Sequence, residues 1–114
     1  MKVRVKISLN DDDGSFMGIG LVWLLRGVEQ FGSVRKSAMQ MKMSYPKAVK
    51  IIDRLEKALG YSLVIRTRGG IRGGNSFVTP EGIAFIEKFE HLHQQITSFS
   101  NEKFNEIFVE SNPH

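Results

Sequence analysis

The sequence predicts a mainly α-helical fold with a small β component (α+β), built as one domain over residues 1–114. Three observations support this prediction. Apolar residues recur every three or four positions in several segments, which is typical of amphipathic helices. Apolar and polar residues alternate at the N-terminus, as in a half-buried strand. Two short apolar runs flank a glycine-rich stretch in the middle of the chain, which indicates a hairpin.

The N-terminal residues 1–10 predict a strand. Over residues 2–9, Val3, Val5, Ile7 and Leu9 alternate with polar residues, so one face is apolar. NDDDGS at residues 10–15 then forms a turn.

Residues 18–31 predict the first helix, which Gly32 ends. Gly20 and Gly27 inside it each cost about 1 kcal/mol relative to alanine, so we interpret them as points of close packing against another element. The apolar stripe of this helix is Leu21, Leu24, Leu25, Val28 and Phe31.

Residues 33–60 predict two more helices joined by a tight turn. Ser33 caps a helix of about 34–41, and Ser44 caps a helix of about 45–59 that Gly60 ends. The turn places Lys42 where a left-handed glycine is usual, which costs about 1 kcal/mol. The buried stripe of the longer helix is Ala48, Ile51, Ile52, Leu55 and Leu59.

Two strands, residues 63–68 and 75–78, flank the loop RTRGGIRGGNS at residues 66–76. Its four glycines allow tight bends and close approach to a partner. The following TPEG has Thr79 as a helix cap, Pro80 at the first helical position and Glu81 in the first turn. We expect this helix to reach about residue 98, with a tail at 99–114.

The order strand, helix, helix, turn, helix, hairpin, long helix is that of a winged helix-turn-helix, with residues 33–60 as the helix-turn-helix and 63–78 as the wing. Ala38 is the small residue expected where the two helices cross. Ser37 beside it is more polar than is usual there.

Charge is distributed unevenly along the chain. Residues 33–78 carry ten Lys or Arg and two acids, a net +8, whereas residues 79–114 carry two Lys and six Glu, a net −4. This asymmetry favours a polyanion, here double-stranded DNA, as the partner of the middle segment. A merely well-solvated surface is the alternative.

The candidate DNA-binding residues lie on the third helix and in the wing. At the helix N-terminus, free backbone N–H groups can meet a phosphate. Its basic residues, with Lys57 among them, face well over 90° away from the buried stripe, and arginines in the loop suit a narrow minor groove. The predicted set is Ser44, Tyr45, Pro46, Lys47, Lys50, Arg54, Arg66, Arg68 and Arg72.

The long helix over residues 79–98 predicts a homodimer. Its apolar residues are spaced by four and three positions, as in a coiled-coil seam, while Ile83 and Ile86 can face the domain core. A single wide stripe that covers only the domain's own core is the alternative. The predicted dimer interface consists of Phe85, Phe89, Leu92, Ile96 and Phe99.

Other classes of function find no support. The chain has no cysteine, no secretory signal and no apolar run long enough to span a membrane, which fits the cytoplasm. His91 and His93 point to different faces of a helix, so we predict no metal site. Nucleotide-binding, nucleophile–base and paired-carboxylate motifs are absent from the sequence. We therefore expect no enzyme activity, no cofactor and no small-molecule ligand.

The stretch from "GSVRKSAMQMKMSYPKAVKIIDRLEKALGYSLVIRTRGGIRGGNSFVTPEG" onward resembles the DNA-binding domain of ModE-type molybdate-responsive regulators and, more distantly, LysR-type winged helix-turn-helix domains. The shared pattern includes the MSYxKA motif, the double-glycine loop and TxxG. The resemblance covers about residues 1–98. It implies that Tyr45, Lys47 and Lys50 face DNA, that Arg66, Arg68 and Arg72 belong to the wing, and that the long helix and N-terminal strand form a dimer.

The resemblance does not carry molybdate sensing with it. ModE-type regulators have C-terminal oxyanion-binding domains, for which 114 residues leave no room. We expect a dimeric, sequence-specific transcriptional regulator. A winged-helix module that binds another protein instead of nucleic acid is the alternative.

Overall fold

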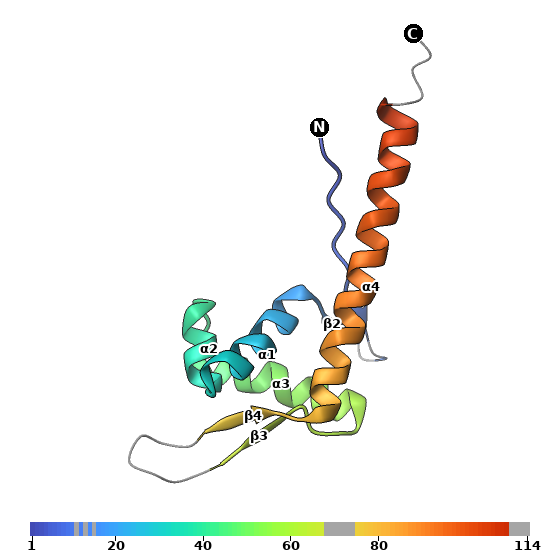
Figure 1. Cartoon of the computed structure of the whole chain (residues 1–114). Coiled ribbons are helices and arrows are strands. Elements are labelled where there is room, and N and C mark those ends of the chain that lie inside the picture. The colour runs from blue at the N-terminus through green and yellow to red at the C-terminus, as the bar shows by residue number, and fades with distance from the viewer. Residues whose placement is uncertain (11, 13, 15, 68–74, 110–114) are drawn as a thin grey trace.

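The computed structural model describes residues 1–10, 12, 14, 16–67 and 75–109, and has the predicted winged helix-turn-helix architecture. Three helices pack together, the β3–β4 hairpin extends to one side, and α4 rises away from them (Figure 1). The elements are β1 Leu9–Asn10, β2 Phe16–Met17, α1 Ile19–Phe31, α2 Val34–Gln40, α3 Tyr45–Leu59, β3 Val64–Arg66, β4 Ser76–Val78, α4 Pro80–Phe104 and a π-helical turn, η1, Asn105–Val109.

The core lies where α1 meets the other helices and the base of the wing. Leu24, Leu25 and Val28 of α1 are fully buried, and Ile52 of α3 and Ile86 of α4 are buried with them. Each comes from a predicted apolar stripe. Burial of these side chains fixes α3 and α4 against α1.

Local signals set the helix ends as predicted. Ser33 Oγ accepts a hydrogen bond from Lys36 N at 3.0 Å, and Ser44 Oγ accepts one from Lys47 N at 3.3 Å. Gly60 ends α3 in the left-handed conformation that glycine adopts without strain. Lys42 also has a positive φ, 56°, as the turn requires.

The two glycines of α1 differ in what surrounds them. A Cβ at Gly27 would lie 2.0 Å from Ser37 Oγ, so α2 approaches α1 closely there. Ser37 is buried and donates a hydrogen bond to Leu24 O at 2.7 Å, which explains how this polar side chain is accommodated beside Ala38. The same interpretation of Gly20 was wrong, because no atom lies within 4 Å of a Cβ placed there.

The predicted N-terminal strand was wrong in its extent. Only Leu9–Asn10 pair, with Phe16–Met17, and residues 1–8 form no ladder. The alternation itself holds, since the apolar positions of residues 2–9 are half-buried and the polar ones exposed. The pattern fixes which face is covered, but a strand also needs a neighbouring backbone to pair with.

The long helix extends further than predicted. α4 runs without a break to Phe104 and η1 follows it, so residues 99–109 of the expected tail are helical. The molecule is 68 Å along its longest axis and 29 and 24 Å across, and α4 rises well above the helices at its base (Figure 1). The second half of α4 therefore extends beyond the other helices (Figure 1).

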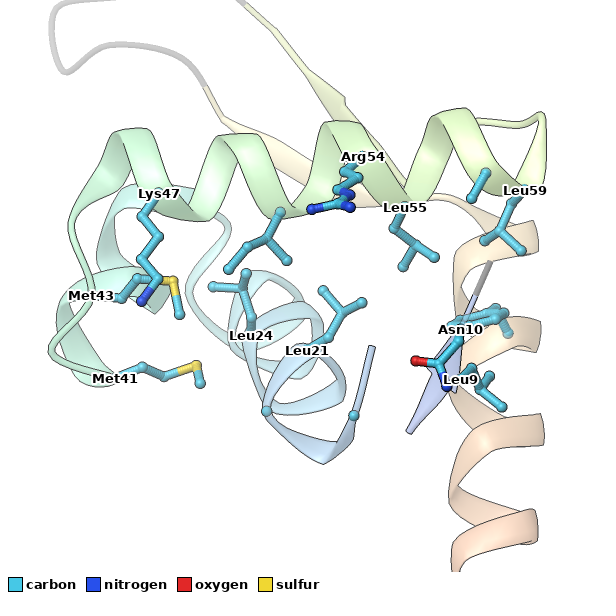
Figure 2. A pocket seen from close by; sticks show the side chains of 15 residues that line it. Leu9, Asn10, Leu21, Leu24, Met41, Met43, Lys47, Arg54, Leu55 and Leu59 are labelled. Atoms are coloured by element: carbon cyan, nitrogen blue, oxygen red, sulfur yellow. The ribbon is translucent and has the colours of Figure 1, made fainter. Parts of the chain in front are cut away.

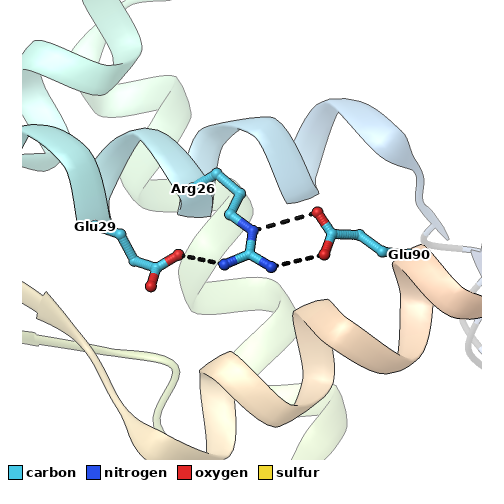
Figure 3. A network of polar contacts seen from close by, with 3 residues as sticks. All are labelled: Arg26, Glu29 and Glu90. Atoms are coloured by element: carbon cyan, nitrogen blue, oxygen red, sulfur yellow. Dashed lines mark hydrogen bonds and ion pairs between the residues drawn. The ribbon is translucent and has the colours of Figure 1, made fainter.

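An ion-pair network joins α1 to α4. The Arg26 guanidinium donates to both carboxylate oxygens of Glu90, at 3.2 and 2.6 Å, and to Glu29 at 2.7 Å (Figure 3). The hydrogen bond from Arg26 lowers the pKa of Glu90, and the two carboxylates raise the pKa of Arg26. A bidentate pair of this kind constrains the angle at which α4 leaves the domain.

Candidate nucleic-acid interface

The N-terminus of α3 presents the first group of candidate residues. Ser44 and Pro46 are exposed, and Tyr45 is half-buried. The guanidinium carbon of Arg35, from α2, lies 4.2 Å from the centre of the Tyr45 ring, a cation–π contact. Sequence reasoning placed Arg35 in the basic segment but not in this site, because only the fold brings α2 and this end of α3 together.

The basic residues of α3 are spread around the helix axis and do not lie on one narrow face. Lys50 and Lys57 are exposed about 140° and 160° around the helix from Leu55. Lys47 and Arg54 lie only about 80° and 100° from it, and both line a cavity beside the core. Their predicted separation from the buried stripe was therefore too large.

The wing begins beside α3. Glu56 of α3 accepts hydrogen bonds from Leu63 N at 2.7 Å and Val64 N at 3.1 Å, which fixes the start of β3 against the helix. Arg66 of β3 lies 3.3 Å from Asp53 of α3 in an exposed ion pair. These contacts hold β3, and β4 paired with it, beside the exposed side of α3.

Thr79 fixes the end of β4 at the base of the wing, beside the start of β3. Its hydroxyl donates to Ser62 O at 2.7 Å and accepts from Gly82 N at 2.9 Å. A Cβ at Gly82 would lie 2.7 Å from Leu63 O, so the TxxG motif lets α4 start directly against β3.

The hairpin pairing brings Ile65 opposite Phe77 and Arg66 opposite Ser76. Thr67 N donates to Asn75 O at 2.8 Å, which continues the pairing by one residue. Arg68, Arg72 and the four loop glycines lie outside the described residues. Of the predicted wing cations, Arg66 is therefore the one that the structure places.

The predicted dimer residues divide into two groups. Phe89 is buried in the protomer's own core and Phe85 is half-buried against it, so neither is fully available to a partner. Leu92, Ile96 and Phe99 are exposed on the projecting half of α4, Phe99 by 57%. The apolar surface that a second copy can reach therefore begins at Leu92, because the apolar residues in the first turns of α4 pack against the domain core.

Within the described residues, no three His, Cys, Asp or Glu side chains gather closely enough to hold a metal ion. Of the helices that the structure describes, none combines the length and apolar character needed to cross a bilayer.

Comparison with known proteins decides the family. The model of the family described as "Bacterial regulatory helix-turn-helix protein, lysR family" matches residues 23–82, just over half of the chain. The chain belongs to this LysR family. LysR-family proteins are DNA-binding transcriptional regulators and not enzymes, which confirms the expected class of function. The matched residues run from α1 to the first turn of α4, and so include the whole candidate interface.

One relative supports the more specific resemblance. The molybdenum transport protein ModE of Azotobacter vinelandii is 29% identical to this LysR-family chain over 105 residues. The match covers 90% of the chain and 39% of ModE, so the chain spans well under half the length of that relative.

Solved structures support the fold. The CbnR DBD in a complex with DNA superposes with a TM-score of 0.57 at 23% identity, over 76% of this chain and 93% of that one. The BenM DBD in a complex with benA site 1 DNA gives a TM-score of 0.56 at 22% identity, over 80% and 96% of the two chains. Both likenesses confirm the winged-helix fold.

Proposed function

We propose that this protein binds double-stranded DNA in a sequence-specific manner as a dimer, with the N-terminal half of α3 in the major groove and the wing on the adjacent backbone or minor groove. The observation that carries the proposal is the arc of exposed cations along α3, in a chain that belongs to a family of helix-turn-helix regulators. The DNA complexes of the similar CbnR and BenM domains favour the same partner.

Each group of residues has a distinct role in this proposal. Ser44, Tyr45 and Pro46 bring the helix N-terminus and its free N–H groups to a phosphate. Lys47 and Lys50 reach base edges, and Arg54 reads guanine or clamps a phosphate.

The remaining cations position the protein on the duplex. Arg35, held on the Tyr45 ring, adds a phosphate contact from α2, as the first helix of such motifs does. Arg66, Arg68 and Arg72 contact the backbone or minor groove from the wing. We place this activity in the bacterial cytoplasm, where such a regulator meets its DNA.

The dimer follows from the exposed second half of α4. A helix whose apolar residues remain exposed over several turns is unstable alone in water, and a second copy offers the matching surface. Residues 2–8, with alternating half-buried side chains and unpaired backbone, are available to join the same contact. Two-fold symmetry then presents two copies of α3 to two half-sites.

A charge-reversal pair tests DNA binding. Mobility shift with genomic fragments, followed by sequencing of the bound pool, identifies the preferred duplex. Lys50→Glu should abolish retention of that duplex, because it places a carboxylate among phosphates. Lys88→Glu makes the same charge change at an exposed position of α4 and should retain it.

Equal retention by the two variants would overturn the proposed interface. If the wild-type chain enriches no DNA sequence, the proposed sequence specificity is wrong. A winged-helix module that binds another protein would then be the better interpretation.

A further inference from the structure

A cavity of about 600 Å³ opens between α1 and α3 (Figure 2). Leu21 and Leu24 of α1 lie across it from Leu55 of α3. Among the described lining residues, the polar ones are Lys47, Arg54 and Asn10. A cavity of roughly 300–1,000 Å³ with apolar walls and a few polar groups is the usual form of a small-molecule site.

The cavity extends along α3. Its lining includes α3 residues from Lys47 to Leu59, twelve positions apart, which corresponds to about 18 Å of helix. Met41 and Met43 lie at the Lys47 end, and Leu9 lies at the Leu59 end (Figure 2). The shape suits an extended apolar body, and methionine side chains adapt readily to different ligands.

The charge on the cavity is positive. Within the described residues, Lys47 and Arg54 have no ion-pair partner, whereas Arg66 on the other side of α3 is paired with Asp53. No acidic residue is among the described lining residues. The guanidinium group of Arg54 extends along α3 toward Lys47 in Figure 2, so the two long side chains can approach one anionic group. Arginine matches a carboxylate with two parallel hydrogen bonds.

We propose that this cavity binds an amphipathic carboxylate, a molecule with one carboxylate head and an extended apolar body. The body lies among Leu21, Leu24 and Leu55, and the head lies at Arg54 and Lys47. Apolar walls favour the body because its apolar surface is removed from water. The two cations select the carboxylate over an uncharged head.

Occupancy also affects DNA, a consequence that rests on the proposed function. Lys47 and Arg54 are candidate DNA contacts, and a carboxylate bound between them offsets one of their two positive charges and occupies their hydrogen-bond donors. Ligand and duplex therefore bind antagonistically, and the ligand lowers the affinity for DNA by the same factor as DNA lowers the affinity for the ligand.

Isothermal titration calorimetry of the full chain tests the site without DNA. Decanoate, kept below its micelle-forming concentration, is the probe, with decan-1-ol and decyltrimethylammonium as controls of equal chain length. Decanoate should bind once per chain and at least tenfold more tightly than either control. Equal binding of all three probes would overturn the proposal. Absence of binding would also overturn it, and is the result expected if a partner protomer fills the cavity.

Two variants locate the binding. Gly20→Leu fills the open space at the cavity wall and leaves both cations in place, so it should abolish decanoate binding. Gln30→Leu places a leucine at an exposed α1 position that does not line this cavity and should bind normally. Arg54→Gln should reduce the preference for decanoate over decan-1-ol about tenfold and serves if Gly20→Leu fails to fold. Wild-type affinity in both Gly20→Leu and Arg54→Gln would place the ligand elsewhere and refute the site.

DNA titrations with and without decanoate then separate the two proposals. Saturating decanoate should raise the Kd for the selected duplex in the wild type and not in Gly20→Leu. If decanoate binds but the wild-type chain binds no duplex, the proposed function fails while the carboxylate site stands. If both bind without affecting each other, the antagonism is refuted.

Discussion

Single side chains decide how closely the elements of this domain approach. At Gly27 the missing Cβ makes room for Ser37, whose hydroxyl satisfies Leu24 O inside the core. From sequence alone, a glycine inside a helix suggests close packing against another element, and this interpretation applies equally to Gly20 and Gly27. The distinction between them depends on where α2 lies, which the chain's own periodicity does not specify.

Gly27→Ala should reduce the free energy of unfolding by about 1–3 kcal/mol, because the new methyl group overlaps Ser37 in a packed region. Gly20→Ala, in the same helix, meets open space and should be neutral or stabilise by up to about 1 kcal/mol. Urea denaturation monitored by circular dichroism measures both. Equal effects of the two substitutions would contradict the packing described for α1 and α2.

Elements are placed by contacts between residues far apart in sequence. The starts of α2, α3 and α4 and the ends of α1 and α3 were predictable, because serine caps, Pro80 and the stop glycines act on their immediate neighbours. The end of α4 carries no such signal and was placed too early. The Arg26–Glu90 pair spans 64 positions, and nothing in the local pattern marks either residue for the other. The N-terminal strand failed for the same reason, since alternation specifies faces and a ladder requires a partner strand.

Glu90→Gln should make stability less dependent on pH. Arg26 lowers the pKa of Glu90 in the folded protein, so this pair stabilises above the unfolded-state pKa and the contribution is lost as pH falls through the lower, folded value. The side chains are 38% and 41% exposed, so we expect less than about 1 kcal/mol at pH 7. The difference between wild type and variant should shrink at pH 3.

Glu87→Gln provides the control, because Glu87 is an exposed glutamate on the same helix. Urea denaturation at the two pH values compares the variants. If Glu90→Gln and Glu87→Gln change the pH dependence of the free energy of unfolding equally, the ion pair with Arg26 contributes nothing to stability.

The shape of the molecule leaves apolar side chains exposed on the projecting half of α4, among them Leu92, Ile96 and Phe99. Ile96→Asp places a charge on this seam and should convert the protein to monomers in sedimentation equilibrium. Gln94→Asp places the same charge on the opposite side of α4 and should leave the dimer intact. A wild-type chain that sediments as a monomer at micromolar concentration would contradict the dimer.

The proposed DNA binding requires that the exposed cations of α3 and the wing neutralise DNA phosphates. Fluorescence anisotropy with the selected duplex, repeated over a range of salt concentrations, tests it most directly. Each neutralised phosphate contributes about −0.9 to the slope of log affinity against log salt. We predict a steep negative slope for the wild type, a shallower slope for Arg54→Ala and no change for Lys88→Ala. An affinity independent of salt would contradict the account.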